Sequence, residues 1–177
     1  MLCAGVLSYA QLVEINTVER VALPEGVTVD KATLSPDGSF VVFSQNTAAG
    51  LHKMDLNSRE ISMISANGNS FDLQIATDGT VVFRESKTAE NKLRYTSLKA
   101  VNARGVETTL VAPTRDLNGF AVNGTNVMTV DNNKVEAKSL NGGAAVKMPV
   151  ASIRYGQLCI DGEIISPNGT EGASYLW

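Results

Sequence analysis

Short runs of β-forming residues alternate along this chain with short stretches rich in Gly, Asn, Asp, Ser and Pro. Residues 29–35 (VDKATLS), 40–44 (FVVFS), 51–56 (LHKMDL) and 60–65 (EISMIS) are four such runs. The stretches between them contain PDGS, QNTAAG and NSR, whose residue types favour turns. No segment shows a sustained apolar period of 3.6 residues with helix caps. The pattern therefore predicts an all-β protein.

The pattern also repeats, with a period of about 42 residues. Two landmarks show this. Turn pairs at Asp37-Gly38, Asp78-Gly79 and Asn123-Gly124 each precede a β-rich run, and their glycines are 41 and 45 residues apart. Similar runs that begin at Leu51, Leu93 and Val135 recur at intervals of 42 residues.

Each repeat contains four β-runs, which is the pattern of one β-propeller blade. The repeats cover about residues 27–67, 68–113 and 114–150, with a partial unit over 151–177. We therefore predict a single propeller-like domain over residues 11–177, made of about three and a half blades of four antiparallel strands. A closed propeller has four to eight blades. The sequence is thus expected to be a fragment or a truncated reading frame, whose open edges and apolar faces would favour aggregation.

The recurring turn has a physical explanation. Glycine adopts the positive φ of a tight reversal without a Cβ clash, and an Asp side chain can bond the backbone N–H two residues on. We expect Asp37 and Asp78 to play this part. The apolar run Val41-Val42-Phe43 that follows is typical of a strand covered on both faces. One blade cannot cover both of its own faces, so the blades must stack.

The first repeat resembles the repeat of TolB-type β-propellers, a family with WD-like repeats. The resemblance rests on LSPDGSFVVFS at residues 34–44, followed by LHKMDL. The second repeat keeps Asp78, Gly79 and Phe83, with Ala76-Thr77 in place of Ser-Pro, and the third keeps only Asn123-Gly124. The resemblance to TolB-type propellers spans about residues 27–150, and it implies a protein partner in the cell envelope. In such propellers, a new strand like the one beginning at Ser174 leads into the next Ser-Pro-Asp-Gly turn.

Composition narrows the class of partner. The chain has 177 residues, a hydrophobic fraction of 44%, a charged fraction of 19% and a net charge of −3. These values are typical of a globular domain. An acidic chain without a clustered Lys/Arg surface is a poor nucleic-acid binder. No stretch approaches the roughly 18 apolar residues of a membrane-spanning helix.

The first ten residues have two interpretations. The apolar run Leu2–Leu7 precedes Ser8-Tyr9-Ala10, whose small residues suit cleavage by signal peptidase between Ala10 and Gln11. The basic stretch expected in front is missing. Residues 1–10 are therefore either the remnant of a signal peptide or an ordinary first strand. The signal peptide would make the protein periplasmic or secreted.

The two cysteines carry little functional information. Cys3 would leave with a signal peptide, and it lacks the small preceding residues of a lipid-anchoring motif. Cys159 lies between apolar residues and is expected to be a buried structural thiol. A disulfide between them is disfavoured by the signal hypothesis.

The sequence contains no pattern that indicates a catalytic or metal-ligating residue or a cofactor, and the binding residues are unknown. His52 stands alone in a strand pattern, so we expect a structural or surface role. The motifs G-x-S-x-G, G-x-G-x-x-G and G-x-x-x-x-G-K-[ST] are absent. Residues 84–94 (RESKTAENKLR) indicate a solvated hairpin loop. Two oxygen-rich stretches, with Asn67, Asn69 and Asp72 in one and Asp131, Asn132 and Asn133 in the other, are more typical of connecting turns than of calcium-binding loops. The two glycosylation-type triplets, which begin at Asn123 and Asn168, coincide with expected turns.

Three functional hypotheses remain. The first is a non-catalytic exported propeller that offers its loops to a protein partner. The second is the propeller gating domain of a prolyl-oligopeptidase-like serine peptidase whose catalytic domain is absent from this chain. The third is a small-molecule sensor that binds at the propeller axis, for which no residue is nominated.

The coding DNA beyond Trp177 would separate the first two hypotheses. A further Ser-Pro-Asp-Gly repeat followed by a stop codon is the outcome expected for the scaffold. A G-x-S-x-G motif further on would instead support the peptidase.

Overall fold

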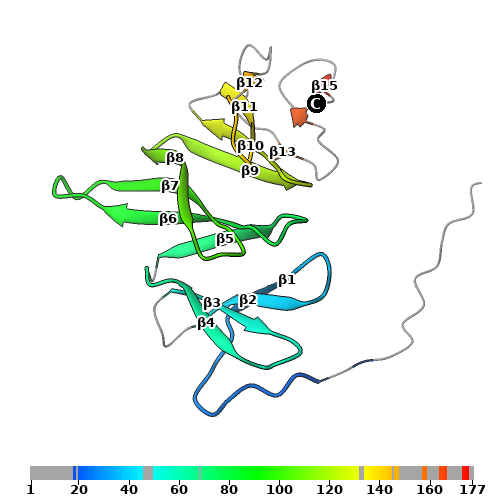
Figure 1. Cartoon of the computed structure of the whole chain (residues 1–177). Helices are drawn as coiled ribbons and strands as arrows, with labels where there is room; N and C mark the ends of the chain where they lie inside the picture. The colour runs from blue at the N-terminus through cyan, green and yellow to red at the C-terminus, as the bar shows by residue number, and fades with distance from the viewer. Residues whose placement is uncertain are drawn as a thin grey trace, which may run out of the picture.

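Each sequence repeat forms its own antiparallel sheet, and the sheets are stacked in chain order (Figure 1). The computed structural model describes residues 18, 20–45, 50–67, 69–131, 134–144, 146–147, 157–158, 164–166 and 173–175. Within these residues every regular element is a strand. The predicted all-β fold of stacked four-stranded blades is therefore confirmed.

The first two sheets have four strands each, and the strands pair in sequence order. The first sheet contains β1 (Lys31–Leu34), β2 (Phe40–Ser44), β3 (Leu51–Asp55) and β4 (Ile61–Ser65). The second contains β5 (Ser70–Ile75), β6 (Val81–Thr88), β7 (Arg94–Val101) and β8 (Glu107–Thr114).

The third and fourth sheets continue the stack. The third contains β9 (Leu117–Asn123), β10 (Asn126–Asp131), β11 (Lys134–Ser139) and β12 (Val146–Lys147). The fourth contains three short strands, β13 (Gln157–Leu158), β14 (Ile164–Ser166) and β15 (Ala173–Tyr175). The first strands of neighbouring sheets contact one another, β1 with β5, β5 with β9, and β9 with β13. These first strands therefore form the inner side of the stack.

The last strand differs from the expectation that a strand beginning at Ser174 leads into another blade. β15 pairs with β14 in the fourth sheet, in the register Ile165 opposite Ser174. An isolated two-stranded hairpin is only marginally stable. The third strand gives the short β13–β14 hairpin a further set of backbone hydrogen bonds.

The two Asp-Gly turns have the predicted geometry. Asp37 Oδ1 accepts the Ser39 N–H at 3.0 Å, and Asp78 Oδ1 accepts the Thr80 N–H at 2.9 Å. Gly38 and Gly79 have φ values of 72° and 80°. Hydrogen bonds from Ser35 and Ser39 lower the pKa of Asp37 to about 2. The prediction that these aspartates bond backbone is therefore confirmed.

The third turn is shorter than its two counterparts. Asn123 pairs directly with Asn126, so only Gly124 and Thr125 form the loop between β9 and β10. Gly124 has a φ of 58°, which suits the first position of a two-residue hairpin loop. The shared Gly therefore has the same conformational role in a different loop.

The spacing of 42 residues between Leu51 and Leu93 does not join equivalent positions of the first two sheets, so this prediction is wrong for the second repeat. Leu51 pairs with Ser44, two residues after the buried Val42 of the preceding strand. In the second sheet the corresponding position, opposite Arg84 and two residues after Val82, is Leu98. Leu51 and Leu98 are fully buried, whereas Leu93 is 39% exposed. The β6–β7 hairpin is longer than the β2–β3 hairpin, and this extra length moved Leu93 into a misleadingly regular spacing.

Apolar side chains between consecutive sheets form the core. Val42, Phe40 and Leu51 of the first sheet meet Val81, Phe83 and Val101 of the second. A second cluster joins the second and third sheets and contains Ala76, Val82, Leu98, Ala100, Leu117, Phe120, Val122 and Val127. Val42 is 0% exposed and its neighbour Phe43 is 1% exposed, so the β2 strand is covered on both faces as predicted. Each fully buried side chain of this size contributes about 1.5–3 kcal/mol.

Polar side chains reinforce the junction of the second and third sheets. The Gln74 carboxamide donates to Phe120 O at 3.3 Å and accepts from Val122 N at 2.8 Å. Arg84 Nη2 donates to Asn118 O at 3.1 Å. Gln74 and Arg84 are here called the inner clamp. They satisfy backbone groups of the inner strand β9, which another strand does not cover on that side.

We predict that Gly50→Ala destabilises the protein much more than Gly38→Ala. A Cβ on Gly50 would clash with the backbone oxygen of Ser65, whereas a Cβ on Gly38 meets nothing within 4 Å. Both residues have positive φ, at 102° and 72°, so both substitutions carry backbone strain. We expect a loss of about 1–2 kcal/mol for Gly38→Ala and about 3 kcal/mol or more for Gly50→Ala. Urea unfolding measures both, and equal losses would contradict the close approach of these backbones.

Candidate functional site

The β6–β7 hairpin projects beyond the neighbouring sheets (Figure 1). It contains eight paired positions, from Val81 opposite Val101 to Thr88 opposite Arg94, whereas β2 and β3 have five. Residues 87–94 are exposed. Just before them, where the hairpin leaves the sheet, the Ser86 and Thr96 hydroxyl groups share a hydrogen bond of 2.9 Å. The hairpin is therefore an arm that places its tip in solvent.

Local hydrogen bonds give the tip of this arm a defined shape. Ala89 N donates to Leu93 O at 2.9 Å, and Lys92 N donates to Ala89 O at 2.9 Å. Asn91 Oδ1 accepts from Leu93 N at 3.0 Å, while Asn91 Nδ2 donates to Tyr95 Oη at 3.1 Å. A tip held by its own bonds loses less conformational entropy on binding than an unstructured loop would.

The arm is braced against the inner strand β5. The Arg94 guanidinium lies 5.9 Å from the ring centre of Phe71, within cation–π range. Next to Phe71, a β-bulge interrupts the pairing of β5 with β6, and Asp72 has a φ of 53°. Asp72 Oδ2 and Arg84 Nε are 3.2 Å apart and form an ion pair. A bulge re-aims side chains, and here Phe71 is left 36% exposed at the root of the arm.

A cleft of about 680 Å³ opens beside Phe71, between the inner strands β1 and β5. It is here called the inner cleft. Its lining combines charged, hydroxyl and apolar groups: Asp30, Lys31, Ala32, Thr33, Ser44, Gln45, Leu51, Ser70, Phe71, Asp72 and Leu73. The volume lies within the range of sites that hold small molecules or parts of a peptide. The arm, Phe71 and the inner cleft together form the candidate binding face.

An ion network with the buried Glu85 and the largely buried Lys99 at its centre lies at the root of the arm. Glu85, whose side chain is 4% exposed, lies 3.3 Å from Lys99 Nζ and 3.1 Å from Lys87 Nζ. Lys99 Nζ is also 2.6 Å from Glu107 Oε1. Burial raises the pKa of Glu85, but hydrogen bonds from Lys87, Asn67 and Lys99 outweigh burial and lower that pKa. The hydrogen bond to Glu107 raises the pKa of Lys99.

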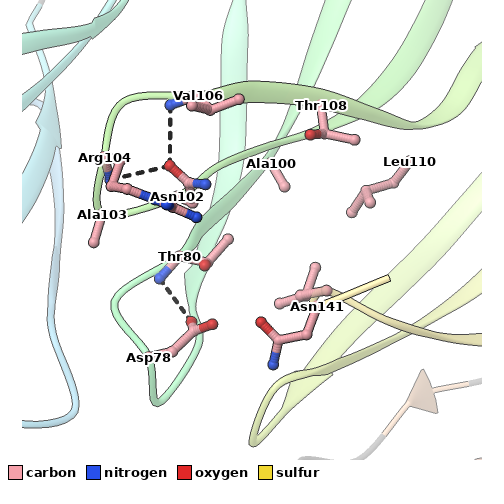
Figure 2. Close-up of a pocket in the computed structure, with 11 residues that line it drawn as sticks. Asp78, Thr80, Ala100, Asn102, Ala103, Arg104, Val106, Thr108, Leu110 and Asn141 are labelled. Atoms are coloured by element: carbon pink, nitrogen blue, oxygen red, sulfur yellow. Dashed lines mark hydrogen bonds between the residues drawn. The ribbon is translucent and has the colours of Figure 1, made fainter. Parts of the chain in front are cut away.

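A second cleft, of about 370 Å³, lies at the opposite loop end of the second and third sheets (Figure 2). Asp78 and Thr80 reach it from the β5–β6 turn, Asn102 and Arg104 from the β7–β8 turn. Asp78 and Asn102 already accept backbone N–H groups of their own turns. Within the described residues, the Arg104 guanidinium makes no ion pair. The sensor hypothesis, which places its ligand at the propeller axis rather than at this loop end, is not tested by this cleft and stays a prediction.

His52, the single histidine, lies in β3 and is 8% exposed. Its ring stacks on Phe43 with 5.7 Å between the ring centres. The structure thus places it in the packed face of the first sheet, and Nδ1 has no hydrogen-bond partner among the described residues.

The oxygen-rich stretch around residues 67–72 forms a connection between two sheets. Asn67 Oδ1 accepts from Asn69 N at 3.0 Å, and Asn69 O accepts from Ser86 N at 3.1 Å. Asp72 pairs with Arg84. The stretch 84–94, expected to be a solvated loop, is strand at both ends, because β6 extends to Thr88 and β7 begins at Arg94.

Several residues considered from the sequence lie outside what the structure describes. These are residues 1–10 with Cys3, Cys159, Asn132, Asn133, Asn168 and the side chain of Asp131. Sequence reasoning missed Gln74, Arg84, Glu85 and Lys99. The only signal was the charged Arg84-Glu85 pair directly after the apolar run Val81–Phe83.

The described part of the chain contains no group of three His, Cys, Asp or Glu side chains arranged to hold a metal ion. It also contains no helix of the length and hydrophobicity that crossing a membrane requires.

We predict that Glu85→Gln lowers the free energy of unfolding by about 1–3 kcal/mol at pH 7, because Lys99 loses a buried partner. The pKa of Glu85 is lower in the folded state than its ordinary value of 4.5. Its stabilising effect is therefore present above about pH 5 and is lost as the pH falls through the folded pKa. The variant should show a smaller loss of stability between pH 5 and pH 3 than the parent.

Glu90→Gln is the matched control, because Glu90 is an exposed carboxylate at the tip of the same arm. We expect its stability to stay within about 0.5 kcal/mol of the parent. Chemical denaturation at a series of pH values measures all three proteins. A Glu85→Gln variant with the pH dependence of the parent would contradict this assignment.

Comparison with known proteins identifies the fold and no family. No family model matches the sequence, and no curated protein matches it either. Solved structures do match, at sequence identities that show the fold alone.

Three of these structures illustrate the likeness. An acylaminoacyl peptidase from Pyrococcus horikoshii aligns over 84% of this chain and 30% of its own, with a TM-score of 0.64 and 11% identity. A eukaryotic initiation factor aligns over 88% and 40%, with a TM-score of 0.58 and 15% identity. A putative gluconolactonase aligns over 82% and 59%, with a TM-score of 0.52 and 15% identity.

This chain therefore spans between 30% and 59% of the lengths of these three proteins. The structures it resembles are β-propeller proteins. Its stacked four-stranded sheets have the fold of part of a β-propeller.

Proposed function

We propose that this chain is a protein-interaction scaffold of the TolB-like propeller type that acts in the periplasm or outside the cell. The single observation that supports it best is the β6–β7 arm, which projects an ordered and exposed tip beyond the neighbouring sheets (Figure 1). The Ser-Pro-Asp-Gly repeat supports the TolB-like assignment, and the apolar run before Ala10 supports export.

The arm has the composition of a contact surface. Leu93 and Phe71 are apolar side chains exposed by 39% and 36%, and Arg94 and Tyr95 lie beside them. Tyr and Arg are enriched among the residues that dominate binding energy at protein interfaces. Because Phe71 and Arg94 already touch, this part of the surface requires little rearrangement on binding.

We predict that the double variant Leu93→Asp/Arg94→Glu captures at least tenfold less of its partner than the parent. The change removes the apolar tip and reverses the cation of the arm. The measurement uses the full-length gene product as bait in cell-envelope extracts, and the captured protein is quantified by mass spectrometry.

The matched control is Arg104→Glu/Val106→Asp, which makes the same two types of change at the other loop end of the second sheet. Val106 is 56% exposed. Both variants should unfold at the temperature of the parent. Equal capture by the arm variant and the parent, or equal loss in the two variants, would contradict a partner site on the arm.

The likeness to the acylaminoacyl peptidase favours a second candidate function. The chain would then be the propeller gating domain of a prolyl-oligopeptidase-like serine peptidase, and catalysis would lie in another domain. In that case the full-length product should hydrolyse peptides without a partner. Active-site labelling with a fluorophosphonate would mark a serine outside residues 1–177.

A further inference from the structure

Two neighbouring junctions between inner strands differ, because one is filled by side chains and the other is open. Between β5 and β9, the inner clamp fills the junction, because Gln74 and Arg84 reach the β9 backbone at 2.8–3.3 Å. Between β1 and β5 the inner cleft of about 680 Å³ remains.

The pairing registers identify the residues responsible for this difference. Gln74 pairs with Val82, and Thr33 pairs with Val42. Val82 and Val42 are both 0% exposed, and each packs into the cluster shared with the next sheet. Thr33 is therefore the counterpart of Gln74.

The same comparison applies to the second residue of the inner clamp. Arg84 lies two residues after Val82, and Ser44 lies two residues after Val42. Arg84 pairs with Leu98 and Ser44 pairs with Leu51, both of which are fully buried. Thr33 and Ser44 both line the inner cleft. Their side chains are shorter than those of Gln and Arg, which accounts for the open space.

The charges around the inner cleft favour a neutral occupant. Asp30 and Lys31, which are neighbours in the sequence, contribute one negative and one positive charge to its lining, so these two charges cancel. Asp72 is already paired with Arg84 at 3.2 Å. The remaining polar lining consists of hydroxyl and carboxamide groups from Thr33, Ser44, Gln45 and Ser70. An added cation or anion would gain little here, whereas a neutral donor and acceptor would find partners.

We propose that the inner cleft binds the carboxamide of a glutamine side chain in an extended segment of the protein partner. Gln74 shows how such a group is used in the neighbouring junction, where its amide donates to one backbone group of an inner strand and accepts from another. The inference rests on the proposed scaffold function, because the cleft opens at Phe71, beneath the arm.

The test uses three small probes, the N-acetyl N-methylamides of glutamine, norleucine and arginine, titrated into the ¹⁵N-labelled chain. We expect the glutamine probe to shift the backbone amide signals of residues 32–33 and 70–73 at least threefold more than either other probe. Equal shifts with norleucine would overturn the carboxamide assignment, and so would larger shifts with arginine.

A filled variant, Thr33→Gln/Ser44→Arg, copies the inner clamp into the open junction. It should retain or raise the unfolding temperature and reduce the shifts caused by the glutamine probe at least fivefold. Thr33→Ser/Ser44→Thr keeps the side chains short and should bind as the parent does. The single variant Thr33→Gln repeats the test if the double variant does not fold. Undiminished shifts in a folded filled variant would overturn the proposal.

The two proposals fail in different ways. Leu93→Asp/Arg94→Glu removes partner capture in the scaffold hypothesis. It should leave the glutamine probe shifts at residues 32–33 unchanged, because neither Leu93 nor Arg94 lines the inner cleft and the Arg94 contact is with Phe71 of β5 rather than with β1. If the probe shifts are lost in the filled variant while capture in the arm variant is normal, the cleft site stands and the arm site does not.

Discussion

Burial of apolar side chains between consecutive sheets is the interaction on which the rest of the structure depends. A four-stranded sheet of this kind has two largely apolar faces. Val82 and Phe83 show this, because these adjacent residues point to opposite faces and are both buried, Val82 in the cluster with the third sheet and Phe83 in the cluster with the first. A blade cannot cover both faces by itself. The stacking of blades is therefore a condition for the stability of each blade, and the apolar clusters between the sheets provide it.

The polar groups at the inner side of the stack are a consequence of this arrangement. Stacking brings the first strands of neighbouring sheets together, but it does not hydrogen-bond them into one sheet. Their backbone groups then need other partners. Gln74 and Arg84 supply these at the β5–β9 junction, whereas the short side chains of Thr33 and Ser44 leave the β1–β5 junction open. The same blade geometry can thus produce a sealed junction or a cleft through two side chains.

The candidate binding face arises from departures from the regular repeat. The β6–β7 hairpin is longer than its counterpart in the first sheet, and β5 contains a bulge at Asp72. Lengthening a hairpin exposes its tip without disturbing the apolar clusters, because the extra pairs lie beyond the neighbouring sheets. The buried pair of Glu85 and Lys99 lies at the root of this arm, where polar groups replace the apolar ones nearer the core. The candidate binding face therefore lies where the second repeat departs from the first.

The sequence by itself determined most of the strands, the Asp-Gly turns and the repeat of one sheet per unit, because each depends on local chemistry. The Asp-Gly turns require a residue that tolerates positive φ, and the buried strands require continuous apolar runs, so both leave a local pattern. Tertiary structure alone decided that Leu98 is the counterpart of Leu51, that Gln74 reaches β9, and that Glu85 is buried beside Lys99. These facts depend on strand register and on contacts between sheets, to which residues distant in the chain contribute. A local sequence pattern does not predict which side chain reaches the next blade, because that depends on how the two sheets are placed against each other.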